Sequence, residues 1–238
     1  MRNRAEQIPA PIRRLLRPLV NAVCNTWTPA ALHWGCRLVG SSCTFDFGGE
    51  RYRYFWPLNR TARRSERVVE LPIAWDRVRR TDPAGTLEIG NVLPNFFPVR
   101  HLVVDKYERV PGVINEDVVD FSPPGKYDLI VSISTLEHVG WDPPEPRDPF
   151  KLLRAVDNLR SHLTDDGELF VTLPRGWNAE VDRFMSEGRI PFAERRCLKR
   201  ISADNRWEEA DCLDLEGVAY GTPFEYANGI TVGSIRKA

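Results

Sequence analysis

The stretch YDLIVSIST, residues 127–135, has the composition of a β-strand that is buried on both faces. Its apolar residues are nearly continuous, as in a parallel sheet that helices cover on both sides. Short apolar runs also occur at residues 86–90, 101–106, 112–117 and 167–174, and two further strands are predicted at 195–202 and 229–236. A helix is predicted over 148–163, where Asp148 can cap the first turn and Pro149 needs no donor. Strands that alternate with helical segments predict a doubly wound α/β fold.

The chain divides into two parts in this interpretation. Residues 81–238 form the α/β domain, and residues 1–80 form a helical and irregular extension packed on it. Apolar residues recur at helical spacing over 12–23, with arginines on the opposite face. This amphipathic helix either packs on the domain or makes a peripheral contact with a membrane surface or a partner. A second helix is expected from Thr28 to Gly40, a hairpin or edge strands over 45–56, and a short helix within 59–75.

Composition excludes several classes of protein. Lys plus Arg and Asp plus Glu both number 33, so the net charge is zero and no nucleic-acid partner is expected. The five cysteines are scattered without a CxxC pair, and the four histidines form no ligand cluster, so we expect neither a disulfide framework nor a metal site. This cysteine usage favours the reducing cytoplasm. No apolar run is long enough to span a membrane, and no secretion signal is recognisable.

The segment TLEIGNVLPNF, residues 86–96, joins the first strand of the domain to a turn. A dinucleotide-binding loop would have two more glycines after Gly90, but Val92 and Pro94 stand at those positions. Pro94 has no N–H to offer a phosphate, and the Val92 side chain hinders close approach of the backbone. No GxxxxGK[ST] motif occurs either. Cofactors that are held by their phosphates, including NAD, are therefore disfavoured.

Acidic residues stand at the ends of three predicted strands. Glu88, Asp105 and Asp117 would meet at one edge of the sheet, where open α/β folds bind ligands. S-adenosylmethionine has no phosphate, but it carries a sulfonium, an ammonium, a ribose diol and an adenine amine. Carboxylates suit each of these groups, so the pattern favours S-adenosylmethionine as the cofactor.

The motifs LEIG, VVDKYE, INEDVVDF, YDLIVSISTLEHV and LTDDGELFVTLP together resemble those of the class I S-adenosylmethionine-dependent methyltransferases. The resemblance covers residues 86–174. In detail, the motifs are similar to those of a bacterial branch of this family that is associated with sugars and cell-surface glycans. It implies a Rossmann-like, mostly parallel sheet of seven strands with an antiparallel C-terminal strand. Asp105 to Asp117 spans only twelve positions, so a loop replaces the usual helix between those strands.

The resemblance also implies roles for individual residues. Glu88 would orient the first loop and the amino-acid moiety, Asp105 would bind the ribose, and Asp117, or Glu116 if the register shifts by one, would lie near adenine. The complete set of cofactor-binding positions is Glu88, Gly90, Asn91, Asp105, Lys106, Asp117, Val118 and Ser134.

The segment after residue 135 provides candidates for catalysis. His138 is a candidate general base, since an oxygen acceptor must lose its proton and imidazole titrates near neutral pH. His138 can equally form a hydrogen bond within its own loop. Glu137 can either hold that loop in place or take part in catalysis. Acceptor-binding candidates, which suit a sugar ring, are Trp141, Asp142, Arg175, Trp177 and Asn178.

Two functions remain open from the sequence. The first is O-methylation of a sugar, a glycan or another small hydroxylated metabolite. The alternative is a non-catalytic methyltransferase-fold module that docks a partner or a membrane surface through its N-terminal helices. The oligomeric state is unknown.

Overall fold

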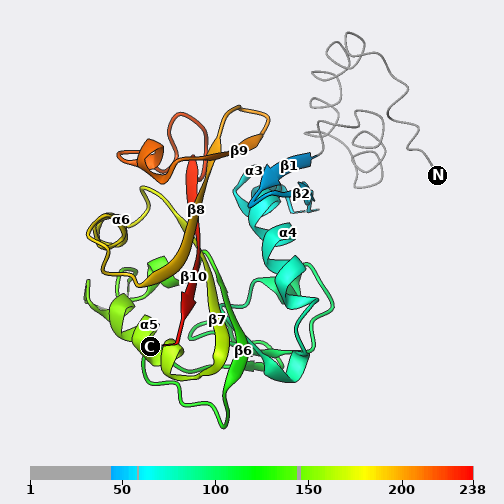
Figure 1. The fold of residues 1–238 in the computed structure, drawn as a ribbon, viewed down its shortest axis with the longest axis vertical. Coiled ribbons are helices and arrows are strands. Elements are labelled where there is room, and N and C mark those ends of the chain that lie inside the picture. The colour runs from blue at the N-terminus through cyan, green and yellow to red at the C-terminus, as the bar shows by residue number, and fades with distance from the viewer. Residues whose placement is uncertain (1–43, 58, 144–145, 238) are drawn as a thin grey trace, which may run out of the picture.

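The computed structural model describes residues 44–57, 59–143 and 146–237, and it shows an α/β fold built on one large sheet (Figure 1). The strand order is β5-β4-β3-β6-β7-β10-β8-β9. The bounds of these strands are β3 Thr86–Ile89, β4 Leu102–Val104, β5 Val113–Ile114, β6 Tyr127–Ile133, β7 Leu163–Pro174, β8 Phe192–Arg200, β9 Trp207–Ala210 and β10 Gly229–Arg236. The other elements are β1 Thr44–Phe47, β2 Glu50–Arg53, α3 Arg60–Arg64, α4 Arg67–Val78, α5 Lys151–Ser161, α6 Ala179–Ser186 and the 3₁₀ turns η3 Pro83–Gly85, η4 Leu93–Asn95, η5 Leu136–His138 and η6 Cys212–Leu215.

The predicted Rossmann-like sheet is confirmed, and one strand extends it. Strands β5, β4, β3, β6 and β7 are parallel, whereas β10 runs antiparallel between β7 and β8. The added strand, β9, pairs antiparallel with β8 at the edge of the sheet. Its Trp207 is buried, and the backbone N–H of Trp207 donates to the Tyr54 hydroxyl at 2.7 Å. This anchoring explains a strand in a stretch where the sequence indicated only a long loop.

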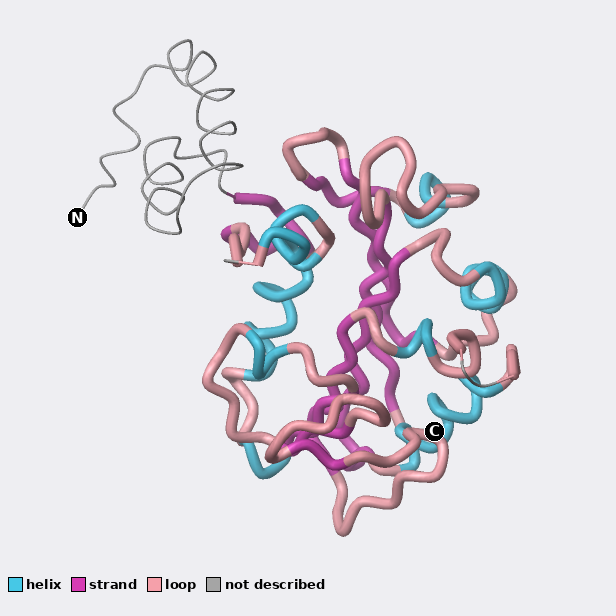
Figure 2. Tube along the Cα trace, turned by 180° about the vertical axis from the view of Figure 1, so that it is seen from behind, coloured by secondary structure: helices cyan, strands magenta, loops and turns pink. Residues whose placement is uncertain are grey.

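The sheet has a hydrophobic core on each face, because successive side chains of a strand point to opposite sides. Leu129, Val131 and Ile133 of β6 pack in the cluster that includes α4, whereas Ile130 packs with α5. Figure 2 shows helices on both sides of the strands. The two-sided burial accounts for the nearly continuous apolar composition of the central strands.

The helices differ from the sequence predictions mainly at their ends. The predicted helix 148–163 is α5, Lys151–Ser161, and Asp148 still accepts a hydrogen bond from the Phe150 N–H at 3.1 Å. The segment 59–75 forms two helices, α3 and α4, rather than one short helix. Helix α4 lies against β6, although it belongs to the predicted extension, and the boundary at residue 80 stays a prediction. The hairpin β1–β2 is confirmed. The helices predicted over 12–23 and 28–40 lie outside the described residues.

Cys197 of β8 and Cys212 of η6 form a disulfide bond. The sequence predicted no disulfide framework, and this one bond departs from that prediction. Fifteen residues separate them in the sequence, and the folding of β8, β9 and η6 brings their side chains together. Because disulfides persist mainly in oxidising compartments, the cysteine content no longer supports a cytoplasmic location. Within the described ranges, no helix has both the length and the apolar character needed to cross a membrane.

Candidate functional site

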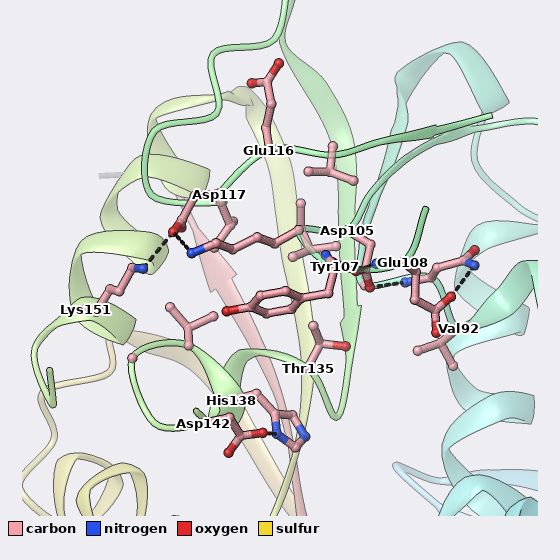
Figure 3. A pocket seen from close by; sticks show the side chains of 18 residues that line it. Val92, Asp105, Tyr107, Glu108, Glu116, Asp117, Thr135, His138, Asp142 and Lys151 are labelled. Carbon is pink, nitrogen blue, oxygen red and sulfur yellow. Dashed lines mark hydrogen bonds and ion pairs between the residues drawn. The ribbon is translucent and has the colours of Figure 1, made fainter. Parts of the chain in front are cut away.

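A cavity of about 330 Å³ opens where strands β3, β4, β5 and β6 end (Figure 3). This is the edge of the sheet at which open α/β folds bind their ligands. Most of the residues predicted for the cofactor and the base line it, namely Gly90, Asn91, Asp105, Lys106, Asp117, Val118 and His138, and so does Asp142, an acceptor candidate. In Figure 3, Asp105 and Glu108 lie at one end, Asp117 and Lys151 at the other, and His138 with Asp142 below. No group of three or more His, Cys, Asp or Glu suited to a metal ion occurs among the residues that the structure describes.

The backbone N–H groups of the loop after β3 are all used within the protein. Gly90 N donates to Val104 O at 2.8 Å, and Asn91 N donates to Asp105 Oδ2 at 3.1 Å. Val92 N and Leu93 N both donate to Glu88 Oε1, at 2.9 and 2.7 Å. The next residue, Pro94, has no N–H. A loop with its donors committed in this way does not form the cradle that a pyrophosphate needs.

Glu88 holds the loop rather than lining the cavity. Its side chain is fully buried, and its second oxygen, Oε2, lies 2.7 Å from His101 Nε2. The predicted loop-orienting role thus agrees with the contacts of Glu88. Its carboxylate, however, is not among the groups that face the cavity.

Asp105 joins the loop after β3 to the loop after β4 at one end of the cavity. Its Oδ1 accepts from Tyr107 N and Glu108 N, each at 2.8 Å, and its Oδ2 accepts from Asn91 N. A carboxylate has about four acceptor positions, so these three bonds leave about one for a ligand. A hydroxyl donor such as a ribose group fits that remaining position.

Glu108 is a site residue that the sequence reasoning missed. Its Oε2 accepts from Asn91 Nδ2 at 2.6 Å, and its side chain lines the cavity. The carbonyl oxygen of the same amide, Asn91 Oδ1, is buried and has no hydrogen-bond donor among the described residues. A buried acceptor that is left without a donor costs free energy. Glu108 could have been found from the sequence as the second acid of the motif VVDKYE, three residues after Asp105.

Asp117 lies at the opposite end, between two lysines. Lys106 Nζ and Lys151 Nζ both donate to its Oδ2, at 2.8 and 2.6 Å. Partial burial acts to raise the pKa of Asp117, but these hydrogen bonds outweigh it and lower the pKa to about 2. Asp117 is therefore ionised at neutral pH. Lys151 was not predicted because it stands 34 residues further along the chain.

The space between these polar ends is apolar. Val104, at the end of β4, lines it together with Val118 and Val139 from the segments after β5 and β6, and the exposed Tyr107 lies beside them. Flat apolar walls of this kind suit an aromatic base. Val118 was predicted to have this position, whereas Tyr107 and Val139 were not.

Ser134 does not face the cavity, contrary to its predicted place beside the cofactor. Its hydroxyl donates to Glu70 Oε1 of α4 at 2.5 Å, and Thr135 lines the cavity instead. Ser134 has a positive φ of 40°, which turns the chain at the end of β6. The reversal of side-chain direction at such a turn could not be read from spacing.

His138 borders both the cavity and an aromatic surface. Its Nδ1 lies 2.6 Å from Asp142 Oδ2, and its ring centroid is 5.4 Å from that of Trp177. Trp177 is 39% exposed and meets Tyr220 edge-on at 4.8 Å between centroids. The carboxylate of Asp142 thus orients the imidazole, while Trp177 and Tyr220 provide a wall beside it. Tyr220 was not predicted.

The remaining acceptor candidates lie away from the cavity lining. Arg175 is buried, with its Nε 3.0 Å from Asp182 Oδ1. Asn178 caps α6, and its Nδ2 donates to Glu137 O at 2.8 Å. The guanidinium of Arg147 lies over the ring of Trp141 at 4.0 Å. In the structure, Arg175 and Asn178 therefore hold α6 in place.

Glu137 is buried beside His138. Burial raises the pKa of Glu137 well above its ordinary value of 4.5, and Glu70 and Glu66 raise it further. Its Oε1 lies 3.6 Å from His138 Nε2, and its Oε2 has no hydrogen-bond partner among the described residues. Burial also raises the pKa of the nearby Tyr220 hydroxyl, so that group stays protonated.

Comparison with known proteins gives a likeness of fold. No protein-family model and no curated protein match the chain. Among solved structures, the chain is similar to the N-methyltransferase NodS from Bradyrhizobium japonicum WM9, with 16% identity over 72% of this chain and 96% of that chain and a TM-score of 0.44. It is also similar to the sugar N-methyltransferase KedS8 from Streptoalloteichus sp ATCC 53650, with 14% identity over 74% and 90% of the two chains and a TM-score of 0.38. A possible histamine N-methyltransferase from Thermotoga maritima matches at 15% identity over 68% and 86%, with a TM-score of 0.40.

Proposed function

We propose that this chain is an S-adenosylmethionine-dependent methyltransferase that methylates a hydroxyl group of a sugar, a glycan or another small hydroxylated molecule. The observation that carries the proposal is the polarity of the cavity. The carboxylates in its lining are acceptors, whereas the N–H groups of the loop after β3 and the ammonium groups of Lys106 and Lys151 already donate to protein oxygens. Such a site favours a cofactor that donates hydrogen bonds and carries no phosphate.

The residues of the cavity fit the parts of S-adenosylmethionine. Asp105 has an acceptor position for a ribose hydroxyl, and Glu108, which lines the same end of the cavity, offers a carboxylate for the ammonium group. Val104, Val118 and Val139 would hold the adenine ring. When bound, the cofactor supplies a methyl group that is activated by the adjoining positive sulfur.

His138 is the proposed base of the reaction. Asp142 accepts from Nδ1 and thereby leaves Nε2 as the acceptor nitrogen. Nε2 can then take the proton of an acceptor hydroxyl as methyl transfer proceeds, a role that contributes about 10²–10⁴-fold to a rate. Trp177 and Tyr220 offer aromatic faces against which a sugar ring could lie.

The open cavity counts against the alternative of a non-catalytic module. Loss of function would favour side chains that fill the cofactor space, but about 330 Å³ stays open here, with Asp105 and Asp117 in its lining. Peripheral membrane contact through residues 12–23 stays a prediction, since that segment lies outside the described residues. A cytoplasmic location and the absence of a nucleic-acid partner also stay predictions.

The test is production of S-adenosylhomocysteine. The purified chain is incubated with S-adenosylmethionine and a panel of sugars, nucleotide sugars and small alcohols. We expect one class of hydroxylated acceptor to give turnover that His138→Ala reduces at least 100-fold, while the affinity for S-adenosylhomocysteine changes little. Turnover on amines alone would contradict O-methylation but retain the methyltransferase. Absence of both turnover and cofactor binding would contradict the proposal as a whole.

A further inference from the structure

We propose that Glu70 of α4 is a positioning residue for the cofactor cavity, acting through Ser134. The inference rests on the proposed function, because it concerns the same cavity. Glu70 lies on the opposite side of the sheet from α5, and its side chain is fully buried. Neither the composition nor the motifs of the chain indicate a role for it.

The first step is the unusual backbone of Ser134. This residue follows the last residue of β6 and has a φ of 40°, a left-handed conformation that non-glycine residues seldom adopt. Its N–H donates to Thr172 O of β7 at 3.0 Å, so the turn begins while the chain is still bonded to the sheet. Conformations of this kind persist only where surrounding groups hold them.

The second step is the set of contacts that holds the turn. The Ser134 hydroxyl donates to Glu70 Oε1 at 2.5 Å. The other oxygen, Oε2, accepts from Arg67 Nη1 at 2.8 Å, and the same nitrogen donates to Ile133 O at 3.1 Å. Helix α4 therefore holds the side chain of Ser134 and the carbonyl group directly before it.

A carboxylate meets this requirement better than an apolar side chain of similar size would. It accepts from the serine and from the guanidinium at once, and hydrogen bonds with a charged partner are about twice as strong as neutral ones. Arg67 also interacts with Glu66 and Glu137, and together with Glu70 these groups raise its pKa, although burial alone would lower it. The guanidinium that pairs with the Glu70 carboxylate is thus supplied by the same helix.

The third step leads from Ser134 to the cavity. The turn lays Thr135 against Gly90, and η5 follows directly with His138 at its end. Thr135 and His138 both line the cavity and lie on the same side of it in Figure 3. The wall that faces the loop after β3 therefore depends on the left-handed conformation of one residue, and Glu70 stabilises that conformation.

Two substitutions at one position separate this role from general stabilisation. Ser134→Ala removes the hydroxyl and keeps the unfavourable conformation, whereas Ser134→Gly removes the hydroxyl and tolerates a positive φ. We expect Ser134→Ala to weaken binding of S-adenosylhomocysteine about tenfold, equivalent to ~1.4 kcal/mol. Ser134→Gly should stay within about threefold of the parent protein, since glycine needs no side-chain contact to adopt the turn. Circular dichroism and thermal unfolding confirm that each variant is folded.

Glu70→Gln then tests whether Glu70 acts through Ser134. In the parent background it should weaken binding, and in the Ser134→Gly background it should change binding little, which is a non-additive cycle. Equal affinities for Ser134→Ala and Ser134→Gly would overturn the proposal, as would equal effects of Glu70→Gln in both backgrounds. If the parent protein does not bind S-adenosylhomocysteine, the proposed function fails instead. Amide exchange of residues 135–138 in the ligand-free variants then decides the positioning role, with faster exchange in Ser134→Ala than in Ser134→Gly expected and equal exchange overturning it.

Discussion

Gly90 and Thr135 pack so closely that no side chain fits between the two loops that carry them. A Cβ atom on Gly90 would lie 2.7 Å from Cγ2 of Thr135, and Gly90 has a φ of +87°. The one glycine retained in the loop after β3 is thus required by the protein itself. Contact between these residues fixes the width of the cavity on that side.

Gly90→Ala should therefore damage both stability and the cavity. We expect a loss of about 1–3 kcal/mol in the free energy of unfolding, because alanine is strained at this φ and displaces Thr135. Binding of S-adenosylhomocysteine should weaken as well. Gly125→Ala is the matched control, since a Cβ there would meet nothing within 4 Å, and urea unfolding should place it within about 0.5 kcal/mol of the parent. Equal effects of the two substitutions would contradict the packing described.

The tautomer of His138 should depend on Asp142. In the parent protein, two-dimensional ¹⁵N NMR of the imidazole groups should show Nδ1 protonated at a pH where the ring is neutral, because Asp142 accepts from that nitrogen. Asp142→Ala should shift His138 toward the Nε2-protonated form. The signal is assigned with His138→Gln. A tautomer that does not respond to Asp142→Ala would remove the orienting role of that carboxylate.

Glu137 should make stability depend on pH. Burial raises its pKa above 4.5, so the folded state holds this proton at pH values where the unfolded state has lost it. The free energy of unfolding should therefore fall as the pH rises from 4.5 through the raised pKa. Glu137→Gln cannot ionise, and we expect it to be about 1–2 kcal/mol more stable than the parent above that range. Urea unfolding between pH 4 and 8 measures this difference.

The free energy of unfolding of the Glu137→Gln variant should still fall with rising pH, but less steeply. The remaining dependence comes from Glu66, because burial and the nearby Glu70 raise the pKa of Glu66 too. The two proteins should converge in stability toward pH 4, where both glutamates are protonated in either state. Parallel stability curves across the whole range would show that Glu137 does not titrate as described.

The disulfide between Cys197 and Cys212 should contribute to stability only under oxidising conditions. A disulfide that closes a loop of about fifteen residues contributes about 3 kcal/mol to the free energy of unfolding. Cys212→Ser should lower the free energy of unfolding by about that amount in oxidising buffer, and a thiol reductant should abolish the difference between the two proteins. Peptide mapping without reduction should recover the two cysteines in one linked fragment. Recovery of both as free thiols would contradict the bond.

The sequence sufficed for features that depend on strand ends. Asp105 and Asp117 could be assigned to one cavity because the carboxyl ends of parallel strands meet at one edge of a sheet. Val92 and Pro94 predicted a loop without a phosphate cradle, and in the structure Glu88 accepts from the N–H groups of Val92 and Leu93.

Other features depend on tertiary contacts that no spacing reveals. Ser134 was assigned to the cofactor, but its positive φ turns the side chain toward α4. Lys151 reaches Asp117 because α5 packs against the segment after β5, where Asn158 donates to Val118 O and Phe121 O. Tyr220 reaches Trp177 from a distant loop. Arg175 and Asn178 carry polar groups suited to a ligand, yet their nearest partners are within the fold. Polar residues near a site could not be divided into ligand-binding and structural ones without coordinates.

Calorimetric titration with S-adenosylhomocysteine tests the central claim, a phosphate-free cofactor held at Asp105, most directly. The parent protein should bind in the micromolar range, about −8 kcal/mol, and Asp105→Ala should weaken binding at least tenfold, since it removes a ligand acceptor and the bond to Asn91 N. Asp120→Asn, an exposed carboxylate outside the cavity, is the control and should bind as the parent does. No heat of binding at millimolar S-adenosylhomocysteine, or equal binding by the parent and Asp105→Ala, would contradict the account.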